Sequence, residues 1–252
     1  MTPIAMTQNE RTHRLIGTKG VANLRSATIT VAGLGGVGSF CIEALARSGV
    51  GHLRIIDHDT VSASNCNRQL HALQSTLGQP KVDVMKSRVL DIDPTITVEA
   101  VQRFFASDTA DELLAAPTDL IIDAIDALGP KIELLARCKE SGIPVITALG
   151  GAARLDPTKV RIAPLAETSG DPLASRVRKL LRRRTSLDGI TAVFSVEPPV
   201  RTAIEGCPTM TDDLFRGRQR VIQPSMMMVP AAIGLAAAAE AVRRISAIGS
   251  DT

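Results

Sequence analysis

A glycine-rich run between an apolar strand and a helix constrains this fold most strongly. Residues 27–33 read ATITVAG, a buried-strand pattern, and GLGGVG at 33–38 leads directly into a helix pattern over 36–48. Glycines let the backbone approach a phosphate group, and the amides and dipole of a helix N-terminus favour anions. Asp57 ends the next apolar run, where a carboxylate can bind a ribose hydroxyl. The pattern predicts a nucleotide site and leaves the nucleotide open.

Short apolar runs alternate with amphipathic segments along most of the chain, which is typical of a parallel sheet flanked by helices. Further strands are expected at 52–57, 95–101, 119–126, 144–150, 160–162 and 192–197, and helices between Pro80 and Asp93, at 131–141, at 172–184 and in the alanine-rich C-terminal segment. We find no repeat and no clear linker. We therefore expect one α/β domain, residues 1–252, Rossmann-like with a mostly parallel sheet and helices on both faces. Its nucleotide-binding half would span about 25–150, and an elaborated C-terminal part about 151–252.

The composition is that of a folded protein, with 44% hydrophobic and 22% charged residues in 252, which excludes a disordered or fibrous chain. The four cysteines, Cys41, Cys66, Cys138 and Cys207, form no CxxC pair, and no signal peptide is recognisable. We therefore expect a reducing cytoplasm. Residues 221–239 carry no charge, but two prolines and polar residues interrupt them, so a loop and a buried helix are predicted rather than a membrane span.

A group of polar residues after Asp57 distinguishes between nucleotides. Asn65, Arg68 and Lys81 lie in and just behind the loop after the second strand. A dinucleotide site neutralises its pyrophosphate mainly with glycine amides, whereas a triphosphate brings about four negative charges that need such side chains. The group favours ATP over NAD, and it disfavours an oxidoreductase.

Two carboxylates end the predicted strand at 119–126. The chain there reads Asp123-Ala124-Ile125-Asp126. A carboxylate at the carboxyl edge of the sheet can hold a Mg²⁺ ion that bridges phosphates. Asp126 is the better candidate because it lies just outside the strand, and Asp123 is expected to cap or support it.

Taken in order, these motifs resemble the ThiF/MoeB group of E1-like adenylating enzymes. The motifs are GLGGVG, D-x-D at 57–59, S-N-x-N-R-Q at 64–69, G-x-P-K at 78–81 and D-A-I-D at 123–126. Within the group, the chain most resembles the tRNA threonylcarbamoyladenosine dehydratases, through EALARSGVG (43–51), NRQLHAL (67–73), LDPTKV (155–160), DPLASRVRKLLRR (171–183) and VFSVE (193–197). The MoeB- and ThiF-like branches usually carry two zinc-binding CxxC pairs. Their absence here agrees with the dehydratase branch.

The resemblance implies an E1-like adenylation fold and a role for each matching residue. It places the ATP-binding glycine loop on Gly33, Gly35, Gly36 and Gly38, the ribose carboxylate on Asp57, the phosphate contacts on Asn65, Arg68 and Lys81, and the Mg²⁺-binding carboxylate on Asp126. It also implies a homodimer in which an N-terminal arginine reaches the ATP of the partner. Arg11 matches best, and Arg14 is the alternative.

The implied reaction is ATP-dependent activation of the threonine carboxylate of N6-threonylcarbamoyladenosine at tRNA position 37, followed by cyclisation with loss of water. Release of AMP after adenylation and release of ADP through an acyl phosphate both stay open. The alternative is an E1-like enzyme that activates a ubiquitin-like sulfur-carrier protein, with sulfur-relay proteins as partners. Cys207 lies in the irregular stretch 198–224, where some E1-like enzymes keep a thioester-forming or sulfur-carrying cysteine, and its role stays open.

One short segment carries a dense positive charge. Residues 176–184 hold six of the 29 Lys and Arg residues and no acid, so acids outnumber bases elsewhere. The six are Arg176, Arg178, Lys179, Arg182, Arg183 and Arg184. Such a stretch can bind an RNA backbone irrespective of base sequence, and the resemblance favours tRNA as this partner. Aromatic stacking is not expected, because the chain has five Phe, no Trp and no Tyr.

Overall fold

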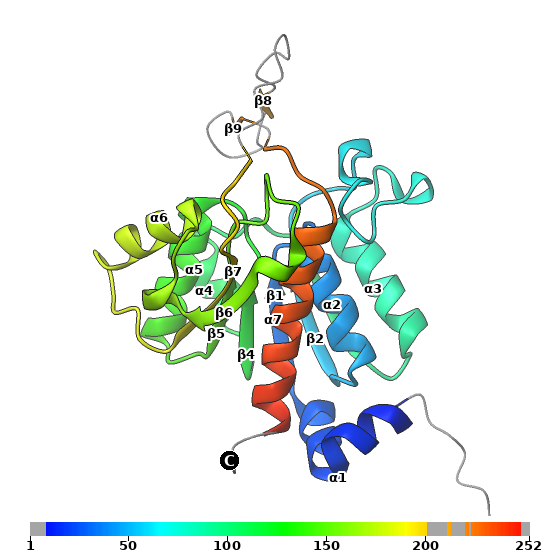
Figure 1. The fold of residues 1–252 in the computed structure, drawn as a ribbon. Helices are drawn as coiled ribbons and strands as arrows, with labels where there is room; N and C mark the ends of the chain where they lie inside the picture. Colours follow the sequence, from blue (N-terminus) through cyan, green and yellow to red (C-terminus); the bar gives the residue numbers. More distant parts are fainter. Residues whose placement is uncertain (1–8, 201–210, 213–219, 222, 248–252) are drawn as a thin grey trace, which may run out of the picture.

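A seven-stranded sheet forms the centre of the structure, a computed structural model that describes residues 9–200, 211–212, 220–221 and 223–247 (Figure 1). The strand order is β3-β2-β1-β4-β5-β7-β6, with β1 (Thr28–Ala32), β2 (His52–Ile56), β3 (Thr97–Val101), β4 (Leu120–Asp123), β5 (Val145–Ala148), β6 (Val160–Pro164) and β7 (Ile190–Ser195). Every neighbouring pair is parallel except β6 with β7. The predicted mostly parallel sheet is confirmed. Two short strands, β8 (Thr211–Asp212) and β9 (Arg220–Val221), form a separate antiparallel pair.

Helices cover both faces of this sheet. One face packs against α2 (Gly38–Arg47), α3 (Lys81–Ile92) and α7 (Met228–Ser246), and the other against α4 (Ala110–Leu114), α5 (Leu128–Glu140) and α6 (Pro172–Leu181). Helix α1 (Glu10–Ser26) packs against α7 at the amino edge of the sheet. Each face has its own cluster of buried apolar side chains: Val31 belongs to the first cluster and Ile121 to the second. Burial on both faces explains why the strands read as nearly unbroken apolar runs.

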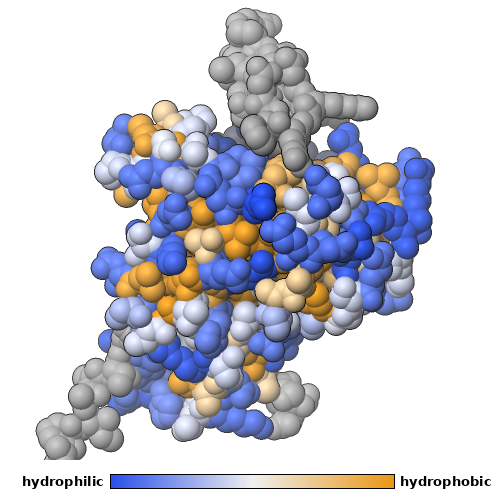
Figure 2. Space-filling view, turned by 180° about the vertical axis from the view of Figure 1, so that it is seen from behind, coloured by the Kyte–Doolittle hydropathy of each residue, from blue (hydrophilic) through white to orange (hydrophobic). Residues whose placement is uncertain are grey.

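The uncharged segment before residue 239 enters α7, as predicted. Val229, Ile233 and Ala237 of α7 are buried in the first apolar cluster. Across the described ranges, no helix combines the length and apolar character needed to cross a bilayer. Seen from behind, hydrophobic residues reach the surface only in patches between hydrophilic ones (Figure 2).

Helix α1 is the longest element that the sequence patterns did not predict, and the short α4 and the β8–β9 pair were not predicted either. Its sequence carries no continuous apolar stripe, and Gly17, at φ 70° and ψ 175°, kinks it. Tertiary contacts hold its end at the amino edge of the sheet, where Arg25 forms an ion pair of 3.1 Å with Asp93, just before β3. Gly51 packs directly on the Arg25 carbonyl. Packing therefore stabilises α1 where local sequence does not.

Gly51→Ala is expected to lower the free energy of unfolding by more than about 2 kcal/mol, because its Cβ would overlap the Arg25 carbonyl. Gly129→Ala is the matched control. No atom lies within 4 Å of its added methyl group, and alanine favours a helix by about 0.5–1 kcal/mol. Urea unfolding measures both variants. Equal free energies would show that this approach of α1 to β2 does not constrain the fold.

Candidate functional site

The strand order reverses between β1 and β4, and this point organises the site. β1 pairs with β2 on one side and with β4 on the other. In open α/β sheets ligands bind in the crevice at the carboxyl ends of such strands. The loops that follow β1, β2 and β4 meet at this edge, at the top of Figure 1. These loops, with the first residue of α3, carry all the predicted ATP-site residues except the N-terminal arginines.

The glycine loop after β1 is packed on one side and open on the other. Gly33 has φ +92°, and its N–H donates to the Ile56 carbonyl at 2.8 Å. A Cβ on Gly33 would lie 2.7 Å from the Ala124 carbonyl oxygen, and one on Gly38 would overlap the Gly33 carbonyl. Around Gly35, by contrast, nothing lies within 4 Å of an added Cβ. The loop therefore packs on the ends of β2 and β4 and leaves space where a phosphate could approach.

Asp57 connects the second strand to the glycine loop. Its Oδ2 accepts a hydrogen bond from the Leu34 N–H at 2.6 Å, and its Oδ1 accepts one from the Asp59 N–H at 2.8 Å. Its exposed fraction is 9%. An ionised carboxylate has about four lone-pair sites, so acceptor capacity is left for a ribose hydroxyl.

Lys81, the first residue of α3, is paired in this structure. Its side chain is 5% exposed, and its Nζ lies 2.7 Å from Asp59 Oδ2. The other oxygen of Asp59 lies 3.0 Å from His58 Nε2. Sequence reasoning assigned no role to Asp59, although its D-x-D spacing from Asp57 was visible. Asp59 supplies the countercharge that an almost buried ammonium needs.

Arg68 lies directly beside the glycine loop. A Cβ on Gly36 would be 3.2 Å from the Arg68 carbonyl oxygen and 3.4 Å from its Cγ. The Arg68 guanidinium donates to the Ser64 carbonyl at 2.9 Å and to Asn67 Oδ1 at 3.0 Å. Asn65 is buried, and its Oδ1 accepts from the Ser62 N–H at 3.1 Å. Asn65 thus shapes the turn that presents Arg68.

The two carboxylates after β4 have different environments. Asp126 is exposed at the site edge, whereas Asp123 is fully buried. Asp123 Oδ2 pairs with Lys131 at 2.6 Å, and its Oδ1 accepts from the Ile125 N–H at 3.1 Å. Mg²⁺ takes one or two carboxylates and completes its octahedron with water and phosphate oxygens. Asp126 fits that donor chemistry, and Asp123 supports the turn that carries Asp126.

A second set of possible metal ligands lies after β2. Ligand atoms of Asp57, His58 and Asp59 are within 4.8 Å of one another. Mg²⁺ prefers oxygen ligands to imidazole, and Asp59 already pairs with Lys81. The magnesium role predicted for Asp126 stays a prediction.

The predicted N-terminal arginines lie at the other edge of the sheet. Arg11 and Arg14 are on α1, which ends immediately before β1 begins. Five strand residues, about 16 Å at 3.3 Å per residue, separate this edge from the site. Arg11 is exposed, and Arg14 forms an ion pair of 3.0 Å with Glu10. The role assigned to Arg11 therefore needs a second copy of the chain.

The basic segment forms α6 and the turn after it, and its side chains differ in their surroundings. Arg176, Lys179, Arg182 and Arg183 are exposed. Arg178 donates to the Thr168 carbonyl at 2.7 Å, and Arg184 pairs with Glu133 at 2.5 Å. The hydrogen bond from Arg184 is the main cause that lowers the pKa of Glu133. Five of the six basic residues are thus exposed, Arg184 among them despite its ion pair, and only Arg178 is partly buried.

A buried ion pair at the start of α6 was not visible in the sequence. Arg154 Nη2 lies 3.2 Å from Asp171 Oδ2, and both side chains are nearly inaccessible. Asp171 Oδ1 caps α6 by accepting from the Ala174 N–H at 2.8 Å. The Arg154 guanidinium also donates to the carbonyls of Gly150 and Glu197. The pair therefore connects the basic helix to the loop after β5, next to the site.

The three cysteines that the structure describes differ in their burial. Cys41 and Cys138 are buried, and burial raises the pKa of both thiols, that of Cys138 to about 12. Cys66 is exposed, because most of the turn around Asn65 faces solvent. Cys207 lies outside the described residues.

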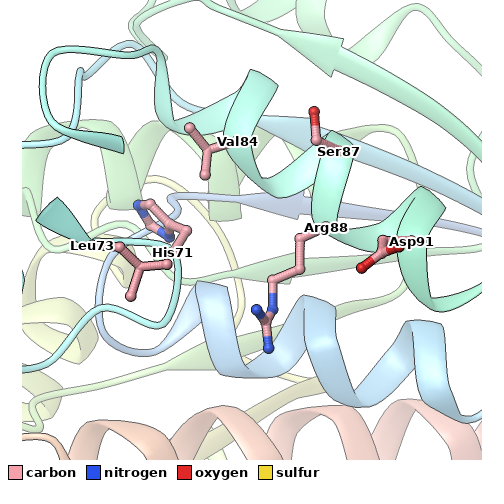
Figure 3. A pocket seen from close by; sticks show the side chains of 6 residues that line it. All are labelled: His71, Leu73, Val84, Ser87, Arg88 and Asp91. Carbon is pink, nitrogen blue, oxygen red and sulfur yellow. The ribbon is translucent and has the colours of Figure 1, made fainter. Parts of the chain in front are cut away.

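His71 follows the turn that carries Asn65 and Arg68. It lines a cavity of about 350 Å³ together with Leu73, Val84, Ser87, Arg88 and Asp91 (Figure 3). It is 1% exposed, and neither ring nitrogen has a hydrogen-bond partner within the described part of the chain. Burial, and next the charge of Lys81, lowers the pKa of His71 to about 4. His71 is therefore neutral at pH 7.

Comparison with known proteins gives close relatives over almost the whole chain. Residues 8–252 match the ThiF family. The chain is 41% identical over 229 residues to the tRNA threonylcarbamoyladenosine dehydratase of Bacillus subtilis (strain 168), covering 90% of each. It is 35% identical over 247 residues to the enzyme of that name from Escherichia coli (strain K12), covering 94% of this chain and 92% of the relative. The crystal structure of the E. coli tRNA N6-threonylcarbamoyladenosine dehydratase in complex with ATP matches with a TM-score of 0.84 and 32% identity, over 99% of this chain and 100% of that one.

His71 should make folding stability depend on pH. The unfolded chain binds a proton below its ordinary pKa of 6.5, whereas the folded chain does so only near 4. The contribution is therefore complete above pH 6.5 and is lost as pH falls towards 4, at a cost of about 3 kcal/mol. Urea unfolding at several pH values should show a flatter dependence for His71→Gln than for wild type. His52→Gln, an exposed histidine, is the control, and identical slopes for all three proteins would contradict the assignment.

Proposed function

This chain belongs to the ThiF family, and from that membership we propose that it is an ATP-dependent tRNA threonylcarbamoyladenosine dehydratase. It activates the threonine carboxylate of N6-threonylcarbamoyladenosine at tRNA position 37 and closes it to the cyclic form. The main support is the similarity to dehydratases over both halves of the chain, including a structure that holds ATP. The open space at Gly35, with Asp57 and Arg68 beside it, agrees with this proposal.

In the proposed reaction the threonine carboxylate attacks the α-phosphate of ATP and displaces pyrophosphate, which gives an acyl-adenylate. The carbamoyl nitrogen of the same substituent then attacks the acyl carbon, loses its proton and expels AMP. The ring closes, and the nucleoside has lost the elements of water. No side chain forms a covalent intermediate, so catalysis consists of positioning and charge neutralisation.

Each polar group of the site has a part in holding ATP. The free amides of the glycine loop and the N-terminus of α2 face the phosphates, and Asp57 binds the ribose. Arg68 and Lys81 neutralise phosphate charge, and Lys81 exchanges its pairing with Asp59 for one with the nucleotide. Asp126 would hold the Mg²⁺ that accompanies ATP, and the bound ion would neutralise charge on the phosphates.

We further propose that the active form is a homodimer. Arg11 lies at the edge of the sheet opposite its own site, so it can act only on the ATP of a partner copy. An arginine supplied in this way adds positive charge where the triphosphate reacts. The isologous arrangement would complete both sites together.

The tRNA backbone is proposed to contact the exposed side of α6. Arg176, Lys179, Arg182 and Arg183 present their charges to solvent there. Arg178 and Arg184 hold α6 to the body of the protein. The Arg154–Asp171 ion pair fixes this helix relative to the loop after β5. An anticodon arm bound on α6 would thus be placed relative to the ATP site.

Incubation of modified tRNA with the protein, ATP and Mg²⁺, followed by digestion to nucleosides, tests the function. N6-threonylcarbamoyladenosine should disappear, and a nucleoside lighter by one water should take its place. Arg68→Ala and Lys81→Ala should each lower kcat/KM by about 10²–10³. Arg47→Ala, which removes an exposed arginine at the far end of α2, should leave kcat/KM unchanged. Unchanged N6-threonylcarbamoyladenosine after incubation with wild type would refute the proposed function, and near-normal rates in either site variant would refute the role assigned to that residue.

A salt titration tests the role of α6. Arg182→Ser together with Arg183→Ser should weaken tRNA binding and reduce the slope of log K against log salt by about 0.7–0.9 for each lost phosphate contact. The affinity for ATP should not change. The matched control, Arg47→Ser with Arg103→Ser, removes the same charge from exposed positions elsewhere. Equal slopes for both double variants would show that net charge, and not α6, sets the affinity for tRNA.

A further inference from the structure

A fully buried ammonium lies beside the turn that carries Asp126. Lys131, in the first turn of α5, has no solvent exposure. Its Nζ donates to Asp123 Oδ2 at 2.6 Å, to the Ala148 carbonyl at 2.9 Å and to Thr147 Oγ1 at 3.2 Å. An ammonium has three N–H groups, and all three are satisfied. Lys131 thus joins the carboxyl ends of β4 and β5.

Through Asp123, this ammonium determines the path of the chain towards Asp126. Asp123 Oδ2 also accepts from Thr147 Oγ1 at 2.7 Å, which leaves its Oδ1 directed at the Ile125 N–H. The hydrogen bond to Ile125 closes the turn after β4, as aspartate side chains commonly do. The direction in which Asp126 leaves the sheet therefore depends on the orientation of the Asp123 carboxylate.

The glycine loop holds the same turn from its other side. The Ala124 N–H donates to the Ala32 carbonyl at 2.8 Å, and Gly33 lies against the Ala124 carbonyl. Loop and turn are in backbone contact, so a shift of the turn would move Asp126 relative to bound phosphates. Lys131 and Gly33 hold the turn between them.

Stability alone gives little reason for this arrangement. Well-packed apolar side chains are often at least as stabilising as a buried ion pair of similar volume. The other residues of α5 on the same buried side, such as Leu134, Leu135 and Cys138, are apolar. What the ion pair adds is a defined orientation for both of its members, in contact with two strand ends at the site.

We propose that Lys131 is a positioning residue for the reaction: through Asp123 it holds the turn of residues 124–127 so that Asp126 is directed at the metal ion accompanying ATP. The inference rests on the proposed function. It predicts that metal binding and metal-free nucleotide binding respond differently to loss of the ion pair. Loss of the ion pair should weaken metal binding in the nucleotide complex and leave metal-free nucleotide binding intact.

The test uses the double variant Asp123→Asn/Lys131→Met, because it removes both charges, conserves volume and leaves no unpaired buried charge. Binding of Mn²⁺ to the complex with a non-hydrolysable ATP analogue is followed by electron paramagnetic resonance. Binding of the analogue alone is measured in EDTA. The double variant should unfold thermally close to wild type and bind the analogue alone within about threefold. Its Kd for Mn²⁺ should rise at least about tenfold.

Two further variants serve as the positive and the negative control for this result. Asp126→Asn should show the same loss of Mn²⁺ binding if the turn acts through this carboxylate. Lys139→Met, which removes an ammonium farther along α5 that bonds to the Asp188 carbonyl, should bind Mn²⁺ as wild type does. In the dehydration assay the double variant should lose kcat, while KM for tRNA stays unchanged.

Unchanged Mn²⁺ affinity and unchanged kcat in the double variant would show that Lys131 contributes to core packing only, and this result would overturn the proposal. An equal loss of analogue binding in EDTA would also overturn it, because the ion pair would then support the whole nucleotide site. If wild type fails to convert modified tRNA but its Mn²⁺ binding still depends on the ion pair, the proposed function fails and the positioning of Asp126 stands.

Discussion

The close packing of three turns at the carboxyl edge of the sheet is the constraint on which the site depends. Gly33 donates to Ile56 at the end of β2 and lies against Ala124 after β4, and Leu34 donates to Asp57. A side chain at Gly33 would meet backbone atoms, which cannot rotate away. One glycine thereby fixes the positions of the Asp57 carboxylate, which is proposed to bind ribose, and of the turn towards Asp126.

Two lysine charges at this edge are paired with carboxylates of the same chain. Lys81 pairs with Asp59, and Lys131 pairs with Asp123. The two pairs have different exposure, since Asp59 is 48% exposed while Lys131 and Asp123 are fully buried. Phosphate oxygens can compete with a partly hydrated carboxylate for an ammonium, but a buried pair cannot exchange partners without unpaired charge. The first pair is therefore suited to exchange with ATP and the second to hold geometry.

The proposed partners would approach from different directions. The edge proposed to bind ATP lies opposite α1, so the arginine on α1 would serve a second copy, while α6 presents its exposed charges beside the loop after β5. The Arg154–Asp171 pair is the connection between α6 and that loop. In this proposed arrangement one sheet would carry all three surfaces.

The sequence by itself determined the parallel sheet, the glycine loop and the family resemblance, because these depend on local periodicity and on short motifs at fixed spacing. Asp57, Arg68 and Asp126 follow predicted strands, so their meeting at one edge follows from the topology of parallel sheets. Only the tertiary structure decided the roles of Lys131 and Arg154, since their partners lie in other elements. A lysine on the apolar side of α5 was the single signal, and it did not reveal which strand ends it joins. Helix α1 formed against its weak local pattern, because contacts distant in sequence outweigh intrinsic propensity.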